Sequence, residues 1–367
     1  MLLKKLCREC RLFYLTGGCL LLAAVILLAV AGTASAAGKP TTLAEIALYR
    51  GPDREKILIE GAKKEGQLTF YDVHTGFRAV AQEFEKKYPF IKVAETRTDG
   101  KELFARVTEE YAAGRYLVDV INLTDLIVLL QREGLLQEYY SPHLAAYGDE
   151  YKSKGKAGGV YYMADLENYI GLGLNTEKIP KAEVPKSLKD LLDPKLKGKM
   201  SISVNTTGIS WLGNALEVMG RDFIDKLSRQ DVKVQSMSGA ALLGLVASGE
   251  VPLSPTIFHD NVFAAKRKGA PVEWRPLEPV VTFVHSAAIT VKAPHPHAAA
   301  LFVDFLHSKE GQKAVIKAGP SSPRKDMDVA ENFKKTIWLA KYTPAEYEKK
   351  YSEWDNLLRS VFMKGKK

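Results

Sequence analysis

Residues 68–94 read LTFYDVHTGFRAVAQEFEKKYPFIKVA, and this stretch decides the fold. Residues 68–71 are a short apolar run, as expected of a buried strand. Apolar side chains then recur at positions 77, 80, 81, 84 and 88, which lie on one face of a helix. Pro89 ends this helix, and residues 91–94 return to a strand. A strand, a helix and a second strand in this order predict a crossover between parallel strands.

The same alternation continues on both sides of this stretch. A helix is expected at 54–64, another opens at 98–101, a strand lies at 118–121, and a helix runs through residue 130. From residue 169 a second series begins. Its expected strands are 169–174, 199–204, 251–258, one around Trp274, and 280–291; its expected helices include 211–218, 239–248, 297–307 and an amphipathic tail at 328–364. The sequence therefore predicts an α/β fold with two lobes, each a mostly parallel sheet flanked by helices.

The first 36 residues have the pattern of an export signal. Lys4, Lys5, Arg8 and Arg11 precede an uncharged run from residue 12 to residue 38, and Ala34-Ser-Ala36 offers small residues to a signal peptidase. The run also exceeds the roughly 20 apolar residues that span a bilayer, so an uncleaved anchor is the alternative. In both cases the remainder of the chain is expected outside the cytoplasm, in the periplasm.

Composition limits the kinds of partner. The chain has 367 residues, of which 46% are hydrophobic and 26% charged, which suits two lobes. Its three cysteines, at 7, 10 and 19, all lie in the signal segment, so the mature chain can form no disulfide. The net charge is +9, of which the signal segment contributes +3. The remaining charge favours an anionic ligand or an anionic membrane surface. No nucleic-acid partner is expected, because no basic stripe with interleaved aromatic residues is present.

The sequence lacks the common motifs of several enzyme classes. Gly-x-Ser-x-Gly, His-Glu-x-x-His and the phosphate-binding Gly-x-x-x-x-Gly-Lys-Ser/Thr pattern are absent, and no cofactor is expected. A binding protein is therefore predicted rather than an enzyme. An exported hydrolase with scattered catalytic residues and a sensor protein remain as alternatives.

Several short segments, in a shared order and spacing, resemble the type II periplasmic solute-binding proteins, in the branch that contains the ferric-ion-binding proteins. The matching segments are EGAKKEG at 60–66, FEKKYP at 84–89, VDVI at 118–121, GKMS at 198–201, SGE at 248–250, KGAP at 268–271, ALFVDFL at 300–306 and SKEGQ at 308–312. The resemblance implies two lobes joined by two crossover strands, with the ligand bound between them. It also implies an ABC permease and its ATPase as partners, and a monomeric receptor.

The expected division of the chain follows from this resemblance. Residues 1–36 are the signal peptide and residues 37–65 are a lead with one helix. Residues 66–168 and 283–367 are the two parts of the first lobe together with the helical tail, and residues 169–282 are the second lobe.

Ligands of open α/β sheets bind beyond the carboxyl ends of the strands, where helices begin. Five such loops supply the expected ligand-binding residues, although turns and helix caps would use the same residue types. The first lobe supplies His74, Thr75, Thr98, Asp99, Gly100 and Thr124. The second lobe supplies Thr206, Thr207, Gly208, His259, Asp260 and Asn261.

The last of these loops departs from the ferric-ion-binding proteins. Those proteins carry two adjacent tyrosines at the positions of His259 and Asp260, and their phenolates hold iron. One interpretation is a small anion bound by His259 and Asn261, with no metal; a zwitterion such as an aminophosphonate or amino acid would also give Asp260 a partner. The alternative is a metal site made of His74, Asp125, His259 and Asp260, since imidazole and carboxylate suit several metals.

Overall fold

The computed structural model describes residues 39–319, 321–327, 333–337 and 342–363. The chain divides into two compact units, residues 1–40 and 41–367, and all the elements below belong to the second. The expected signal segment and residues 328–332 and 338–341 of the expected tail lie outside the described residues. Within the described ranges, no helix combines the length and the apolar character needed to cross a membrane.

The first lobe is built on three parallel strands. β1 (Gln67–Asp72) pairs with β2 (Lys92–Arg97) on one side and with β3 (Val120–Leu123) on the other. These strands alternate with α5 (Phe77–Lys87), α6 (Gly100–Ala112) and α7 (Ile127–Arg132). The crossovers predicted from residues 68–94 are thereby confirmed.

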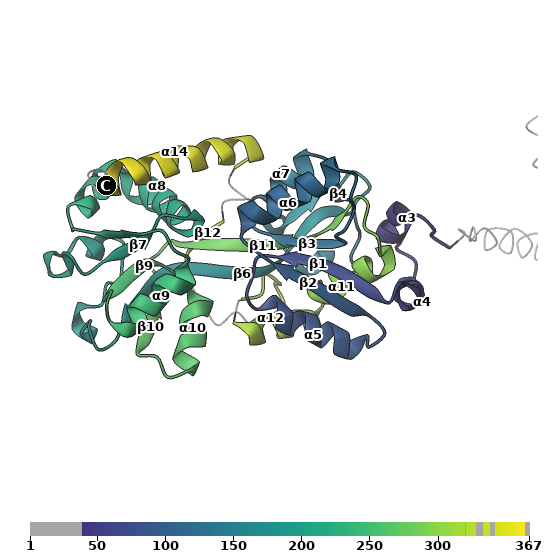
Figure 1. Ribbon diagram of the computed structural model, residues 1–367, viewed down its shortest axis with the longest axis horizontal. Coiled ribbons are helices and arrows are strands. Elements are labelled where there is room, and N and C mark those ends of the chain that lie inside the picture. Colours follow the sequence, from purple (N-terminus) through teal and green to yellow (C-terminus); the bar gives the residue numbers. More distant parts are fainter. Residues whose placement is uncertain (1–38, 320, 328–332, 338–341, 364–367) are drawn as a thin grey trace, which may run out of the picture. The chain divides into compact units, whose positions relative to one another are not determined.

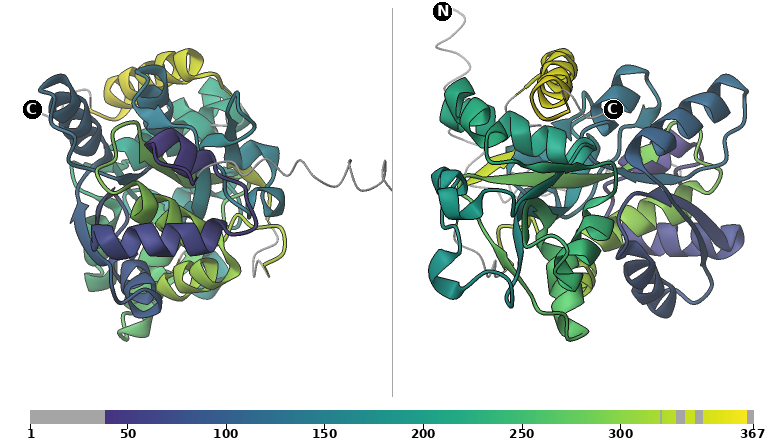
Figure 2. Two further views of the ribbon diagram at one scale, coloured as in Figure 1. Left: turned by 90° about the vertical axis from the view of Figure 1, so that its right-hand side faces the viewer. Right: turned by 60° about the vertical axis from the view of Figure 1, so that its left-hand side comes forward.

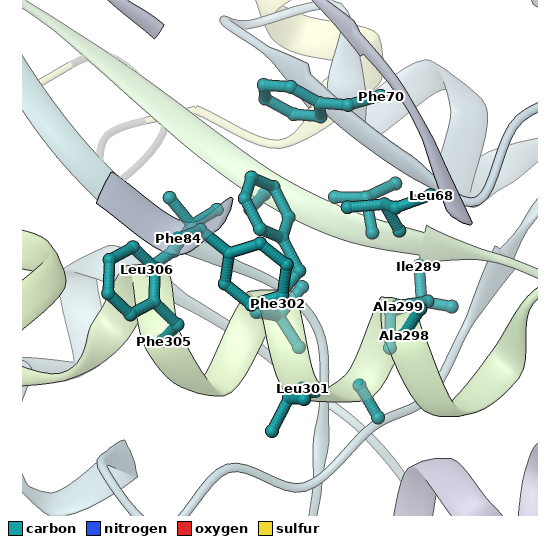
Figure 3. Packing of buried hydrophobic residues seen from close by; sticks show 14 of the residues in the cluster. Leu68, Phe70, Phe84, Ile289, Ala298, Ala299, Leu301, Phe302, Phe305 and Leu306 are labelled. Atoms are coloured by element: carbon teal, nitrogen blue, oxygen red, sulfur yellow. The ribbon is translucent and has the colours of Figure 1, made fainter. Parts of the chain in front are cut away.

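Aromatic packing fixes the helices on this sheet. Phe70 of β1 meets Phe302 of α11 (Pro296–His307), with ring centroids 5.0 Å apart, and Phe84 of α5 meets the same ring at 4.9 Å (Figure 3). All three side chains are fully buried. The core of the first lobe therefore joins segments that are more than two hundred residues apart in the sequence.

Two long antiparallel strands, β6 (Val160–Asn175) and β11 (Val280–Thr290), run between the lobes, and we call them the hinge strands (Figure 1). β11 pairs with β3 of the first lobe. The far end of β6 pairs with β9 (Leu253–Phe258) and β10 (Val272–Arg275) of the second lobe. β6 begins nine residues before the strand expected at 169–174, because its first half crosses out of the first lobe.

The second lobe adds a parallel pair of strands and three helices. β7 (Ser201–Ser203) pairs with β8 (Lys233–Gln235). The helices are α8 (Thr206–Ser228), α9 (Gly239–Ser248) and α10 (His259–Arg267). The described residues also form α3 (Leu43–Leu48), α4 (Arg54–Glu65), β4 (Leu136–Gln137), β5 (Lys152–Lys154), α12 (Lys309–Ala318) and several short 3₁₀ helices.

The tail differs from the single helical segment expected at 328–364. Residues 335–337 form a strand, β12 (Lys335–Ile337), which extends the sheet beside β11, and Lys335 Nζ lies 2.7 Å from the carboxylate of Glu167. Among the described residues of the tail, the helix is α14 (Pro344–Phe362). α14 lies along α8 of the second lobe (Figures 1 and 2).

Candidate functional site

A cavity of about 570 Å³ is bounded by both lobes. In the first lobe, the loops that follow β1, β2 and β3 line the cavity. From the second lobe it takes the N-terminal residues of α8, α9 and α10, and Phe283 and His285 of hinge strand β11 form part of its wall. The cavity is thus at the carboxyl ends of strands, where the sequence predicts the ligand to bind.

The structure brings most of the expected ligand-binding residues together around this cavity. The lining includes His74, Thr75, Thr98, Asp99, Gly100, Thr124, Thr206, Thr207, Asp260 and Asn261. Two helices that begin at the cavity are capped by side chains from these loops. Asp99 accepts a hydrogen bond from the backbone N–H of Lys101, and Asn205 accepts one from the backbone N–H of Thr207. His259 and Gly208 are not part of the lining.

His259 lies instead in an aromatic cluster beside the cavity. Its ring centroid is 4.9 Å from that of Trp274 and 6.5 Å from that of Tyr169. The side chains of His259 and Asp260 therefore leave α10 in different directions. Asp260 lines the cavity, whereas His259 does not.

Gly208 has a packing role at the start of α8. A Cβ at this position would lie 1.8 Å from the carbonyl oxygen of Ser203, so only glycine lets the helix approach β7 this closely. Gly208→Ala is expected to lower the free energy of unfolding by about 3 kcal/mol, at the upper end of ordinary overpacking. Chemical denaturation measures this loss.

The matched control is Gly244, in the exposed part of α9. A Cβ there meets no heavy atom within 4 Å. Gly244→Ala should raise the free energy of unfolding by up to about 1 kcal/mol, because alanine favours the helix. Equal effects of the two substitutions would contradict the packing role of Gly208.

A buried polar contact between the lobes joins His74 to Asp260. The backbone N–H of Gly76 donates to His74 Nδ1 at 3.0 Å, so the other ring nitrogen carries the proton. That nitrogen, Nε2, donates to Asp260 Oδ2 at 2.9 Å. Burial by itself raises the pKa of the Asp260 carboxyl, but the bonds from His74 and Asn168 lower this pKa overall. Asp260 therefore places a negative charge in the cavity wall.

A buried polar network continues from the cavity into the hinge strands. His285 Nδ1 lies 3.2 Å from Asn122 Oδ1, and the amide nitrogen of Asn122 donates to the carboxyl of Asp165. Burial holds the pKa of His285 well below its usual value, so this ring is neutral. His285 therefore adds no positive charge to the cavity.

The alternative metal site is not assembled as a set of four. His74 and Asp260 contact each other. Asp125 bonds to Tyr347, and His259 lies outside the cavity lining. In the part of the chain that the structure describes, no group of three or more His, Cys, Asp or Glu side chains is placed to hold a metal ion.

Several lining residues were not predicted from the sequence, and two groups of them belong to helices α9 and α14. The first is Ser238, Gly239 and Ala240 at the start of α9, which adjoin the 205–207 loop because Asn205 Nδ2 donates to the carbonyl of Met237 at 3.1 Å. Ser238 caps α9, and a serine before two small residues was a usable indication of such a loop. The second set is Tyr347 and Tyr351 of α14.

The cavity wall contains two kinds of polar group. Residues 205–207 and 238–240 present the N-termini of α8 and α9 without any charged side chain, which suits an anionic group. The N-termini of α6 and α10 also meet the cavity, and Arg97 and Lys101 line it. The lining also contains the carboxylate residues Asp99, Asp125, Asp260 and Glu348. The cavity can therefore hold an anion and a cation of one small molecule.

Asp125 is buried, and its carboxylate accepts a hydrogen bond from the hydroxyl of Tyr347 rather than capping α7. Burial raises its pKa from 3.8 to about 6, against the opposing effect of the Tyr347 bond. The folded state therefore binds the proton of this carboxyl more tightly than the unfolded state does. Asp125 contributes most to stability below pH 4, and this contribution is lost as the pH rises to about 6.

Asp125→Asn is expected to be more stable than the wild type at pH 7, because the amide cannot ionise and still accepts from Tyr347. The difference between pKa values of 3.8 and about 6 corresponds to about 3 kcal/mol. Urea denaturation of both proteins at pH 4 and pH 7 measures this advantage of the variant, which should grow with pH. An advantage that does not change with pH would contradict the assignment.

The chain matches the family model of the bacterial extracellular solute-binding proteins over residues 118–347, and it belongs to that family. An uncharacterized protein of Haemophilus influenzae is 29% identical over 273 residues, which is 71% of this chain and 78% of that protein. The resemblance to type II periplasmic binding proteins and the predicted role as the solute-binding subunit of an ABC importer are thereby confirmed.

Solved structures of other proteins are similar to this chain over most of its length. Iron-bound HitA from Pseudomonas aeruginosa is 25% identical, with a TM-score of 0.64 over 80% of this chain and 99% of that one. AfuA from Actinobacillus pleuropneumoniae, with fructose-6-phosphate bound, is 24% identical, with a TM-score of 0.68 over 82% of this chain and all of that one. Both comparisons confirm the predicted two-lobed α/β fold. The family consists of transport receptors and not of enzymes.

Proposed function

We propose that this receptor binds a small zwitterion, with a phosphonate or carboxylate group and an ammonium group, in the cavity between its lobes. The single observation that carries the proposal is the split chemistry of the cavity wall. The N-termini of α8 and α9 offer N–H groups to the anion, while the buried carboxylate of Asp260 faces the same space.

The size of the cavity supports an organic ligand. About 570 Å³ is within the range of pockets that hold small molecules. The proposed site also includes His74, Thr75, Thr98 to Gly100, Thr124, Thr206, Thr207 and Asn261. The segment 1–36 directs export of the receptor. The receptor then releases the ligand unchanged to an ABC permease, which works with its ATPase.

A metal ion is the second candidate. HitA, at 25% identity, is an iron-bound protein, and His74 with Asp260 is one imidazole–carboxylate pair in this cavity. A metal would require further oxygen ligands from Asp125 and Tyr347, which are now bonded to each other. The zwitterion uses the observed contacts without breaking that bond.

Titration calorimetry with three probes tests the proposal. 2-Aminoethylphosphonate carries both charges, ethylphosphonate lacks the ammonium group, and ferric citrate presents the metal. The zwitterion should bind at least tenfold more tightly than ethylphosphonate, because only the zwitterion pairs with Asp260. Equal affinities for the two phosphonates would contradict the proposed role of Asp260, and binding of ferric citrate alone would favour the metal.

A further inference from the structure

Helix α14 is firmly attached to the second lobe. Trp354 is 1% exposed and lies directly on Gly213 of α8, where a Cβ would come within 2.4 Å of the indole ring. Leu358 and Phe362 are buried in the same hydrophobic core, which also contains residues of α8 and β6. Any movement of the second lobe therefore carries α14 with it.

The opposite end of α14 contacts the first lobe. The hydroxyl of Tyr347 donates to Asp125 in the loop after β3. Glu348 forms an ion pair with Arg132 of α7, with 3.3 Å between nitrogen and oxygen. Lys101 Nζ, at the start of α6, lies 5.7 Å from the ring centroid of Tyr351. One helix thus connects the two lobes beside the cavity.

The two tyrosines also form part of the cavity wall. Tyr347 and Tyr351 are four residues apart, so both point from the same face of α14. Both line the cavity, and the Tyr351 hydroxyl donates to Thr206 Oγ1 at 3.2 Å. A capping box between Thr343 and Glu346 fixes where the helix starts, and therefore fixes the position of Tyr347.

We propose that α14 is a third wall of the ligand site, and that Tyr347 and Tyr351 contact the ligand and determine which ligands fit. The ring faces suit the ammonium or aliphatic part of a ligand, and the hydroxyls suit its polar edge. The bond between Tyr347 and Asp125 holds this wall against the first lobe when the site is closed. The ligand contacts rest on the proposed function, whereas the position of the wall does not.

A cross-link tests the position of the wall without any ligand. The chain has no cysteine after residue 36, so Arg132→Cys with Glu348→Cys creates one unique pair. A short bis-maleimide should join the two cysteines within one molecule. The control pair is Glu217→Cys with Tyr342→Cys, whose wild-type side chains are hydrogen-bonded within the second lobe and its tail. Reaction of the control pair alone would overturn the inference.

Ligand contact is tested with single hydroxyl deletions. Tyr347→Phe and Tyr351→Phe are each expected to weaken binding of 2-aminoethylphosphonate by about tenfold, as for loss of one hydrogen bond. Tyr342→Phe, which removes a hydroxyl outside the cavity lining, should bind like the wild type. Circular dichroism checks that all three variants fold.

The outcomes separate this inference from the proposed function. If the wild type binds the probe and both tyrosine variants bind equally well, the inference is overturned while the zwitterion proposal stands. If the wild type binds neither phosphonate, a phosphonate ligand is ruled out, and the cross-link still decides whether α14 lies against the first lobe.

Discussion

Asp260→Ala is expected to weaken binding of 2-aminoethylphosphonate by about 100-fold or more. Asp260 is buried and holds its negative charge through the bond from His74. Removing one partner of a buried, hydrogen-bonded charge pair costs about 3 kcal/mol, which corresponds to roughly 100-fold in affinity. Titration calorimetry of the folded variant measures the loss.

The matched control is Asp222→Asn on α8. Asp222 is 78% exposed and pairs with Lys226 at the surface, so its replacement should leave the affinity unchanged. Asp260→Ala should retain more of its affinity for ethylphosphonate than for the zwitterion. Ethylphosphonate has no ammonium group, so it makes no ion pair with Asp260 that the substitution could remove. An Asp260→Ala protein that binds the zwitterion as the wild type does would refute the site assignment.

Trp354→Ala is expected to be the most destabilising single change in α14. The indole is buried between Gly213 and the rings of Tyr342 and Tyr347. Truncating a buried tryptophan to alanine costs about 3–5 kcal/mol, because the lost contacts leave a cavity. The free energy of unfolding, measured in urea, should fall by this amount.

Two substitutions on the same helix serve as controls. Trp354→Phe keeps an aromatic ring against Gly213 and should lose about half as much stability. Lys349→Ala removes an exposed side chain and should change the stability by less than about 0.5 kcal/mol. If Trp354→Ala were as mild as Lys349→Ala, the attachment of α14 to the second lobe would be wrong.

The sequence predicts those features that local patterns control. Helix α9 was expected at 239–248 and is found there, because Ser238 opens it and Gly249 ends it with a left-handed conformation. The strands and helices of residues 68–94 follow from the same kind of periodicity. The loops at 74–75, 98–100 and 205–207 were found by the rule that ligands meet the carboxyl ends of strands.

Features that depend on distant packing could not be predicted in this way. The spacing of Tyr347 and Tyr351 puts both on one face of a helix. That this face meets the cavity depends on the packing of Trp354 against Gly213, which is 141 residues away in the sequence. Similarly, the local sequence does not show which of His259 and Asp260 lines the cavity. The packing of His259 against Trp274, from a strand further along the chain, turns its ring away from the cavity.

The central claim is that the cavity holds a small organic ligand with opposite charges. Native mass spectrometry of the wild type and of Asp260→Ala, both taken directly from periplasmic extracts, tests it most directly. The account predicts a bound small molecule on the wild type that contains phosphorus or a carboxylate together with nitrogen, and that is lost from the variant. A metal ion bound to the wild type, or the same bound mass on both proteins, would contradict it.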